Sequence, residues 1–261
     1  MYDFEFVKPS SIAEAAKALA ADGAQALSGG QTLLPTMKQR LAAPGTLVSL
    51  TGIAEMQGVC LSDGGLHIGG ATPHAVVAAQ AKPHYPALAA LAGGIGDPAV
   101  RNRGTIGGSI ANNDPAACYP SAVLASGATV VTNKRKIAAD DYFQGMFTTA
   151  LEEGEFVIEV RFPIPQKAAY VKFNQPASRF ALTGVFVAKF ADGVRVAVTG
   201  ASNDGVFRWA EAEAALSADF RAEAIAGLVV DGSDMISDLH GSGAYRANLV
   251  KVLTGRAVSA A

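Results

Sequence analysis

Two glycine-rich segments combine backbone freedom with polar side chains, which is the combination that an anionic ligand needs. They are Ser28–Pro35 (SGGQTLLP) and Thr105–Pro115 (TIGGSIANNDP). Paired glycines let successive backbone N–H groups converge on one point, and a helix that follows adds the positive end of its dipole. Neither segment contains a lysine or an arginine. Together the two segments are expected to grip a diphosphate from both sides without a formal positive charge.

A single Gly-Gly pair is usually part of a turn, so the prediction depends on the occurrence of both segments. Each is expected to leave a strand, and each is followed closely by hydroxyl, amide or carboxylate side chains. A set of turns in a glycine-rich sheet would not explain those polar residues, which are Gln31, Thr32, Ser109, Asn112, Asn113 and Asp114.

Composition narrows the class of protein. The 261 residues are 50% hydrophobic and 17% charged, which is typical of a compact globular chain. The net charge is −2 and no basic run exceeds Lys134–Lys136, so no nucleic-acid partner is expected. No apolar run reaches membrane-spanning length, and the acidic, aromatic start is unlike a signal peptide. We expect a cytoplasmic protein without a transmembrane segment.

The cysteines and histidines give no sign that this chain's own side chains carry out redox chemistry. Cys60 and Cys118 are the only two cysteines, and the four histidines are scattered. Two thiols cannot hold a four-cysteine iron–sulfur cluster, and no metal-ligand spacing is present. Hydrolase chemistry is equally unsupported, because no Gly-x-Ser-x-Gly occurs. Any redox chemistry must come from an organic cofactor or a partner.

The first half of the chain reads as alternating helices and strands. A capping box, with Ser11 as N-cap and Glu14 returning to it, opens the first helix. A strand over 24–27 then leads into the first glycine segment, and Ile68–Thr72 repeats its pattern weakly. Thr72-Pro73 predicts an N-cap followed by proline at the first helical position. Further expectations are helices over 32–41, 75–81 and 86–92, a loop over 93–104, and strands over 46–50, 128–132 and 156–162.

The second half has a different character, and Pro163 and Pro165 mark the change. Asp192-Gly193 predicts a tight hairpin between two strands. Strands are expected over 170–174, 185–190 and 194–199, and helices over 210–216, 221–226 and 245–253. This pattern predicts an α+β unit, an antiparallel sheet with helices on one face.

At these residues the chain closely resembles the FAD-binding medium subunit of the molybdenum hydroxylases. That family includes the xanthine dehydrogenases and, nearest to this pattern, the aerobic carbon monoxide dehydrogenases. The resemblance covers essentially the whole length, and the pairing of both glycine motifs at this separation is specific for the family. The other matching segments are Pro9–Ser11, 68–74, 96–104, 159–163, 176–181 and the helix around Tyr245-Arg246.

The resemblance implies an α+β fold of the vanillyl-alcohol-oxidase type. Residues 1–165 would form the FAD-binding domain, with two α+β subdomains at about 1–57 and 58–165. Residues 166–261 would form a carboxy-terminal domain of antiparallel sheet and helices, like that of the carbon monoxide dehydrogenase flavoproteins, which covers the flavin.

The resemblance also assigns roles by position. Asp114 would lie beside the cofactor, and Val157 would meet the flavin ring through its backbone. Lys172 matches a flavin-contacting lysine, and Phe180 would shield the ring, whereas Ile95 would lie near the adenine end. Backbone N–H groups would wrap the diphosphate at Ser28, Gly29, Gly30, Gln31, Thr32, Thr105, Ile106, Gly107, Gly108 and Ser109. No catalytic side chain and no metal ligand is implied in this chain.

Cys118 is the main departure from the family pattern, because many members have an acidic residue there. A thiol donates weakly and accepts poorly. If that position binds a ribityl or ribose hydroxyl, FAD is bound less tightly here than it would be with an aspartate.

The implied function is electron relay. A small partner subunit with 2Fe-2S clusters would pass electrons to the FAD of this chain, and a large molybdenum-cofactor subunit would transform the substrate. The implied assembly is a dimer of heterotrimers, and the acceptor is a quinone, NAD⁺ or dioxygen. Two alternatives remain: a self-contained FAD-dependent oxidase, and a nucleotide-binding protein without redox turnover. The substrate stays open among carbon monoxide, purines, nicotinate-like heterocycles and aldehydes.

Overall fold

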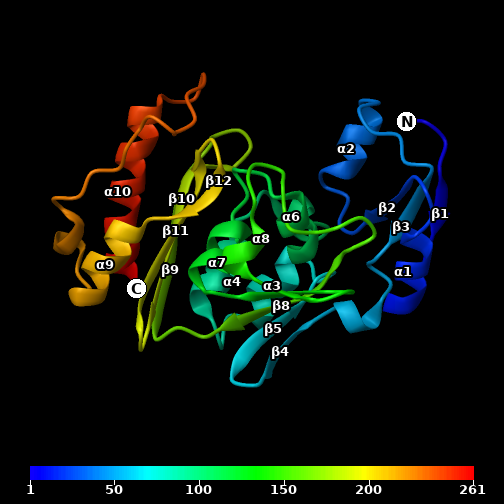
Figure 1. The fold of residues 1–261 in the computed structure, drawn as a ribbon, viewed down its shortest axis with the longest axis horizontal. Helices are drawn as coiled ribbons and strands as arrows, with labels where there is room; N and C mark the ends of the chain where they lie inside the picture. The colour runs from blue at the N-terminus through cyan, green and yellow to red at the C-terminus, as the bar shows by residue number, and fades with distance from the viewer.

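The computed structural model describes residues 1–261 and contains three β-sheets that follow one another along the long axis of the molecule (Figure 1). Helices accompany each sheet, so the predicted α+β class is confirmed. None of the helices combines the length and the apolar character that crossing a bilayer requires.

The first sheet is parallel, with strand order β1-β3-β2. As expected, Ser11 caps the first helix by accepting the N–H of Glu14, but the Glu14 carboxylate bonds to Ser10 and not to Ser11. The second helix ends earlier than expected because Arg40 adopts a left-handed conformation, with φ of 62°. The elements are β1 (Glu5–Val7), α1 (Ile12–Leu19), β2 (Ala24–Leu27), α2 (Leu33–Lys38), β3 (Thr46–Ser49) and the 3-10 turn η1 (Ala54–Met56).

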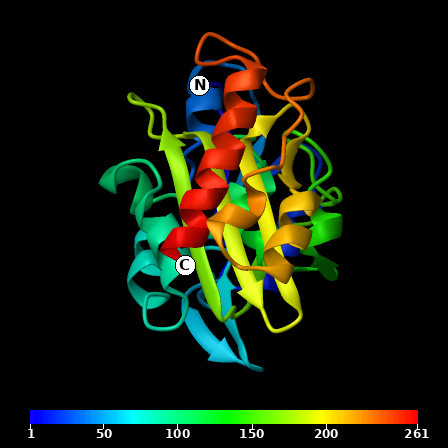
Figure 2. The same ribbon diagram turned by 90° about the vertical axis from the view of Figure 1, so that its left-hand side faces the viewer.

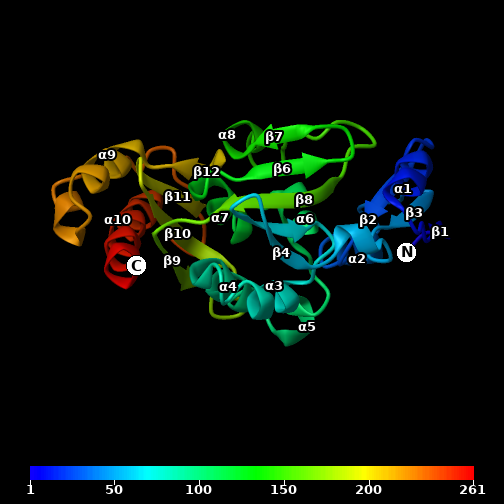
Figure 3. The ribbon, with the colours of Figure 1, turned by 90° about the horizontal axis from the view of Figure 1, so that it is seen from below.

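The second sheet is antiparallel, with strand order β4-β5-β8-β6-β7 (Figure 3). Its inward-facing residues, such as Ile68, Val130 and Val160, pack with the helices α4, α6 and α7 in the largest hydrophobic core. The strands are β4 (Val59–Ser62), β5 (Gly65–Gly69), β6 (Thr129–Thr132), β7 (Lys136–Ala138) and β8 (Val157–Pro163). Of these, β4, β5 and β7 were not predicted, because they are only 3 to 5 residues long.

Several helices of this region differ from expectation, and α8 (Ala139–Tyr142) has no counterpart among the expected helices. Thr72 does not cap the helix that follows; its hydroxyl bonds to the backbone of Gly58 instead. The predicted loop over 93–104 contains a short helix, α5, and an unpredicted helix, α7, has every residue buried. The helices are α3 (His74–Gln80), α4 (Pro86–Gly93), α5 (Pro98–Arg101), α6 (Ile106–Asn112), α7 (Tyr119–Ala125) and α8 (Ala139–Tyr142).

The third sheet is antiparallel, with strand order β12-β11-β10-β9, and the hairpin predicted at Asp192-Gly193 is confirmed. α10 crosses one face of the sheet diagonally, with α9 beside it (Figure 2). The elements are β9 (Lys167–Asn174), β10 (Ala181–Phe190), β11 (Gly193–Ser202), β12 (Gly205–Arg208), α9 (Ala210–Ala218), the 3-10 turn η2 (Ala222–Ile225) and α10 (Gly243–Ala260).

β10 is buried on both faces, which explains its continuous apolar sequence. Val185 and Val187 belong to the core under α10, whereas Phe186 and Ala188 belong to the central core shared with α7. The third sheet therefore connects the two cores directly, and α7 lies against it.

Arg246 of α10 holds the end of this sheet together. The residue is 3% exposed, and its guanidinium donates to the carbonyls of Leu182 and Gly200, at 2.6 and 2.7 Å. It also forms a two-pronged ion pair with Asp238, which fixes the preceding loop. Removing the guanidinium would leave two buried carbonyls and a carboxylate without this partner.

We predict that Arg246→Met lowers the free energy of unfolding by about 2 kcal/mol or more, because the buried carbonyls of Leu182 and Gly200 lose their donor. Denaturant unfolding of the purified chain measures this. The control is Arg221→Met, which breaks an exposed pair with Asp219 and should leave stability nearly unchanged. Equal losses in the two variants would contradict the prediction.

Candidate functional site

Three glycine segments meet where the first and second sheets face each other, and each contact needs the absence of a side chain. A Cβ on Gly29 would overlap the carbonyl oxygen of Arg103. A Cβ on Gly107 would lie 2.5 Å from the carbonyl oxygen of Gly70, and one on Gly70 would overlap that of Val157. These glycines are therefore required for backbone-to-backbone packing. The weak repeat over 68–72 is part of the same arrangement.

The first glycine segment leaves β2 and enters α2, as predicted. Gly30 has φ of 71°, a left-handed conformation that favours glycine. The backbone N–H groups of residues 28–33 donate to no acceptor within the chain. A run of unpaired N–H groups at a strand–helix junction can bind an anion.

The second glycine segment is built differently. It does not leave a strand, so that expectation is wrong; it follows α5 and forms the first turn of α6. Thr105 is the N-cap and accepts the N–H of Gly108. The N–H groups of Ile106, Gly107 and Ser109 already donate to carbonyls within the chain. The side chains of Ser109 and Asn112 form no hydrogen bond within the chain, so they are the free polar groups here.

The two segments are joined by a hydrogen bond of 2.7 Å between the hydroxyls of Ser28 and Thr105, 77 residues apart. Beside this contact lies a cavity of about 670 Å³, a size common for small-molecule sites. Ile106 is the predicted site residue outside its lining, and its side chain lies in the central core. The predicted residues that line the cavity are Ser28, Gly29, Gly30, Gln31, Thr32, Ile95, Thr105, Gly107, Gly108, Ser109, Asp114, Val157, Lys172 and Phe180.

Lys172 and Ile95 lie at the same end of this cavity. The Lys172 ammonium donates to the carbonyls of Gly94 and Arg179, both at 2.8 Å. Phe180 follows Arg179 and is 48% exposed. By resemblance, Ile95 is assigned to the adenine end and Lys172 to the flavin. Ile95 directly follows Gly94, so it lies close to Lys172 in the cavity lining, and both assignments stay predictions.

Val157 belongs to the part of the cavity that adjoins the first sheet. It is the first residue of β8, and its carbonyl packs on Gly70. The preceding residue, Phe156, packs in the small core with Val48 and Leu50. Val157 and Lys172 therefore line different parts of the cavity.

The segment after the second glycine motif is held from the third sheet. Asp114 accepts the N–H of Ala116 in a local turn. The hydroxyl of buried Thr199 lies 2.8 Å from the Pro115 carbonyl and 2.7 Å from that of Ala117. Gly200 also donates its N–H to Pro115. The third sheet therefore fixes the part of the cavity wall that carries Asp114.

Cys118 is 5% exposed and lies at the Lys172 end of the cavity. The Lys172 ammonium lies 3.4 Å from its Sγ. Burial, followed by the neighbouring Cys118, raises the pKa of Tyr170 far above its usual range, so the tyrosine stays neutral. A carboxylate at position 118 would lie beside the Lys172 ammonium and the Tyr170 hydroxyl.

Sequence reasoning missed His74, which lines the cavity and is 4% exposed. Its Nδ1 has no hydrogen-bond partner, and its ring lies 5.3 Å from that of Tyr119. Burial, with a smaller effect from the charge of Arg101, lowers the pKa of His74 to about 4. The imidazole is therefore neutral at physiological pH. Other missed lining residues include Gly70, Glu155, Phe156 and Arg179; of these, only Gly70 had a signal, in the repeated Gly-Gly pattern.

Comparison with known proteins gives a consistent result. Residues 2–165 match the family model described as "FAD binding domain in molybdopterin dehydrogenase". The chain is 33% identical to the glyceraldehyde dehydrogenase medium chain of Sulfolobus acidocaldarius, over 98% of this chain and 97% of that protein. It is 31% identical to the carbon monoxide dehydrogenase medium chain of Hydrogenophaga pseudoflava, over 99% and 96%.

Solved structures agree over the full length. A chain of reconstituted carbon monoxide dehydrogenase from Oligotropha carboxidovorans superposes with a TM-score of 0.90 at 29% identity, covering 99% of this chain and 97% of that one. A chain of quinoline 2-oxidoreductase from Pseudomonas putida gives a TM-score of 0.88 at 28% identity, covering 100% and 97%. The similarity therefore includes both the cavity and the third sheet.

We predict that Gly107→Ala destabilises the chain by about 1–3 kcal/mol, because the overlap with the Gly70 carbonyl costs more than the gain in helix propensity. Thermal and denaturant unfolding measure the loss. Gly45→Ala is the control, since nothing lies within 4 Å of its added Cβ. If Gly107→Ala were as stable as Gly45→Ala, the close packing of the glycine segments would be contradicted.

The depressed pKa of His74 predicts a pH dependence of stability. The folded state binds the proton near pH 4 and the unfolded state near 6.5, so the unfolded chain binds more protons between these values. The free energy of unfolding therefore falls as the pH drops from about 6.5 towards 4. Between pH 7 and 4.5, the free energy of unfolding of His74→Gln should therefore fall by about 2–3 kcal/mol less than that of the wild type. Urea unfolding at the two pH values measures this difference. If the free energy of unfolding fell by the same amount in both proteins, His74 would not contribute to the pH dependence of stability.

Proposed function

Because this chain belongs to the family of FAD-binding medium subunits of molybdenum hydroxylases, we propose that its cavity holds FAD and that the subunit relays electrons. The chain is an oxidoreductase flavoprotein subunit of the kind found in carbon monoxide and xanthine dehydrogenases. In the proposal, electrons arrive from 2Fe-2S clusters of a small partner subunit and leave to an external acceptor. A large subunit with the molybdenum cofactor would transform the substrate, in a dimer of heterotrimers.

The observation that carries the FAD proposal is the run of unpaired N–H groups over residues 28–33 beside a cavity of about 670 Å³. Such groups suit a diphosphate, and their backbone origin explains why no cation is needed there. The orphaned Nδ1 of His74 is a further polar group in the lining. The residues present therefore fit a dinucleotide.

We propose specific roles for the lining residues. Ser28, Gly29, Gly30, Gln31 and Thr32 would bind the diphosphate through their N–H groups, whereas Ser109 would contribute its hydroxyl. Thr105, Gly107 and Gly108 would let the cofactor approach the backbone, with Ile106 acting through the core. Asp114 would accept a hydroxyl of the cofactor. These assignments rest on the hydrogen-bond partners described above.

The end with Lys172, Ile95 and Phe180 is proposed as the flavin end. An ammonium can stabilise negative charge on a reduced ring, and an exposed phenylalanine can cover a flat ring. Because Ile95 lies beside Lys172, our proposal places Ile95 at the flavin end, although the resemblance assigned it to the adenine end. Val157, which the resemblance assigned to the flavin ring, lies with Phe156 at the first sheet, so we propose that Val157 lies towards the adenine end.

FAD supplies the redox chemistry, since it accepts and releases electrons singly or in pairs. The chain's contribution is to bind and orient the cofactor and to set its electrostatic surroundings. We also propose that residues 1–165, with subdomains divided near residue 57, and residues 166–261 are separate domains; the span of the family match supports the first boundary.

The proposal predicts that the purified chain binds FAD in equimolar amount and shows the absorbance bands of a flavoprotein. Oxidation of any donor should require the partner subunits. Absorbance titration, followed by assays of the chain alone and of the whole complex, tests both statements. Donor oxidation by the isolated chain would instead support a self-contained oxidase, and a chain that takes up no FAD would overturn the proposal.

A further inference from the structure

The segment 143–156 forms one wall of the cavity although it contains no helix or strand. It connects α8 to β8, and Thr149, Leu151, Glu155 and Phe156 line the cavity. Without a regular ladder of backbone hydrogen bonds, such a segment depends on side chains to keep its shape. We call residues 143–156 the wall segment.

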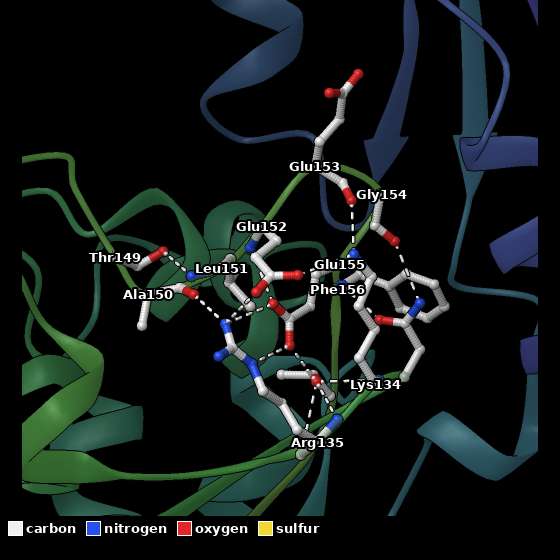
Figure 4. A network of polar contacts seen from close by, with 12 residues as sticks. Lys134, Arg135, Thr149, Ala150, Leu151, Glu152, Glu153, Gly154, Glu155 and Phe156 are labelled. Atoms are coloured by element: carbon white, nitrogen blue, oxygen red, sulfur yellow. Dashed lines mark hydrogen bonds and ion pairs between the residues drawn. The ribbon is translucent and has the colours of Figure 1, made fainter.

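Glu155 is the centre of the contacts that hold the wall segment (Figure 4). Its side chain is fully buried and accepts the hydroxyl of Thr132 at 2.5 Å. It also accepts two guanidinium N–H groups of Arg135, both at 3.1 Å, and the N–H of Glu152 at 2.9 Å. Burial alone would raise the pKa of Glu155, but the hydrogen bonds from Arg135 and Thr132 hold it below its usual value. The group is therefore a charged anchor.

The same contacts reach along the wall segment. Arg135 donates from Nη2 to the Ala150 carbonyl at 2.7 Å. Asn133 accepts the N–H of Phe156 at 2.9 Å and donates to the Gly154 carbonyl at 3.2 Å. The turn between β6 and β7 therefore holds the wall segment at residues 150, 152 and 154–156. Each of these contacted residues either lines the cavity itself or is next in sequence to a residue that lines it.

We propose that Glu155 is a positioning residue that determines how long FAD stays bound, a role that rests on the proposed function. Its carboxylate is saturated by donors of this chain, so it acts through the wall segment and not by contacting the cofactor. Loosening the wall segment opens a route out of the cavity. The first glycine segment, whose free N–H groups would make the first contacts with the diphosphate, has no hydrogen bond to the wall segment.

The test is Glu155→Gln, which keeps the shape of the side chain but removes its charge and replaces one acceptor oxygen with a donor. In the amide, donors from Thr132, Arg135 and Glu152 compete for a single oxygen. Weakening charge-assisted hydrogen bonds by about 1.4 kcal/mol corresponds to a tenfold change. We expect FAD to dissociate about tenfold faster or more, with an association rate within about twofold of the wild type.

Glu213→Gln is the matched control. Glu213 is also a largely buried carboxylate: it bonds to two N–H groups of Arg208 and to the N–H of Val196. It lies on α9, which packs against the third sheet, and does not line the cavity. Both variants should lower the unfolding temperature, but only Glu155→Gln should change FAD dissociation.

Stopped-flow fluorescence gives both rates for the full chain, and displacement of bound FAD gives dissociation directly. Equal dissociation rates in the wild type and Glu155→Gln would overturn the inference while leaving the proposed function intact. Equal acceleration in the two variants would also overturn it, since the effect would then follow from general loss of stability. A wild-type chain that binds no FAD would refute the proposed function itself.

Discussion

The close approach of three glycine segments is the constraint on which the rest of the structure depends. At Gly29, Gly70 and Gly107 a neighbouring carbonyl occupies the place of a Cβ. Glycine in a helix such as α6 costs about 1 kcal/mol relative to alanine, and the chain accepts this cost to bring backbones together. The result is a cavity with walls of backbone, in which the N–H groups of the first segment remain free.

This backbone contact requires support from all three sheets. The first sheet delivers residues 28–33, and the second delivers Gly70 and Val157 through β5 and β8. The third sheet holds the segment after α6 through Thr199 and Gly200, more than 80 residues away in sequence. A change in any sheet can therefore reach the cavity without touching its lining.

The sequence predicted the elements whose signals are local. The strand over 24–27, the hairpin at Asp192-Gly193 and the first glycine turn depend on neighbouring residues, and each lies where it was expected. α7 was missed because an entirely buried helix has no amphipathic period. The Glu155–Arg135 pair was missed because nothing in the sequence around either residue points to a partner 20 positions away.

The glycine segments show how a correct prediction can have an incomplete physical reason. Sequence reasoning gave both segments the same role, a nest of N–H groups. In the second segment those N–H groups bond to Thr72, Gly70 and Thr105, and its glycines serve close packing. Composition cannot separate these uses, because both need a residue without a side chain. Only the partners of each N–H group distinguish a ligand-binding turn from a packed one.

The charged groups of the cavity suit a bound cofactor better than proton-transfer chemistry by the chain's own side chains. Glu155 is saturated by its own hydrogen bonds, and His74 is neutral. Asp114 accepts a backbone N–H in its own turn. Lys172 bonds to two carbonyls, so it is held as a fixed positive charge. Fixed charges around a cavity tune a bound cofactor, whereas a general acid or base must be free to exchange a proton with its substrate.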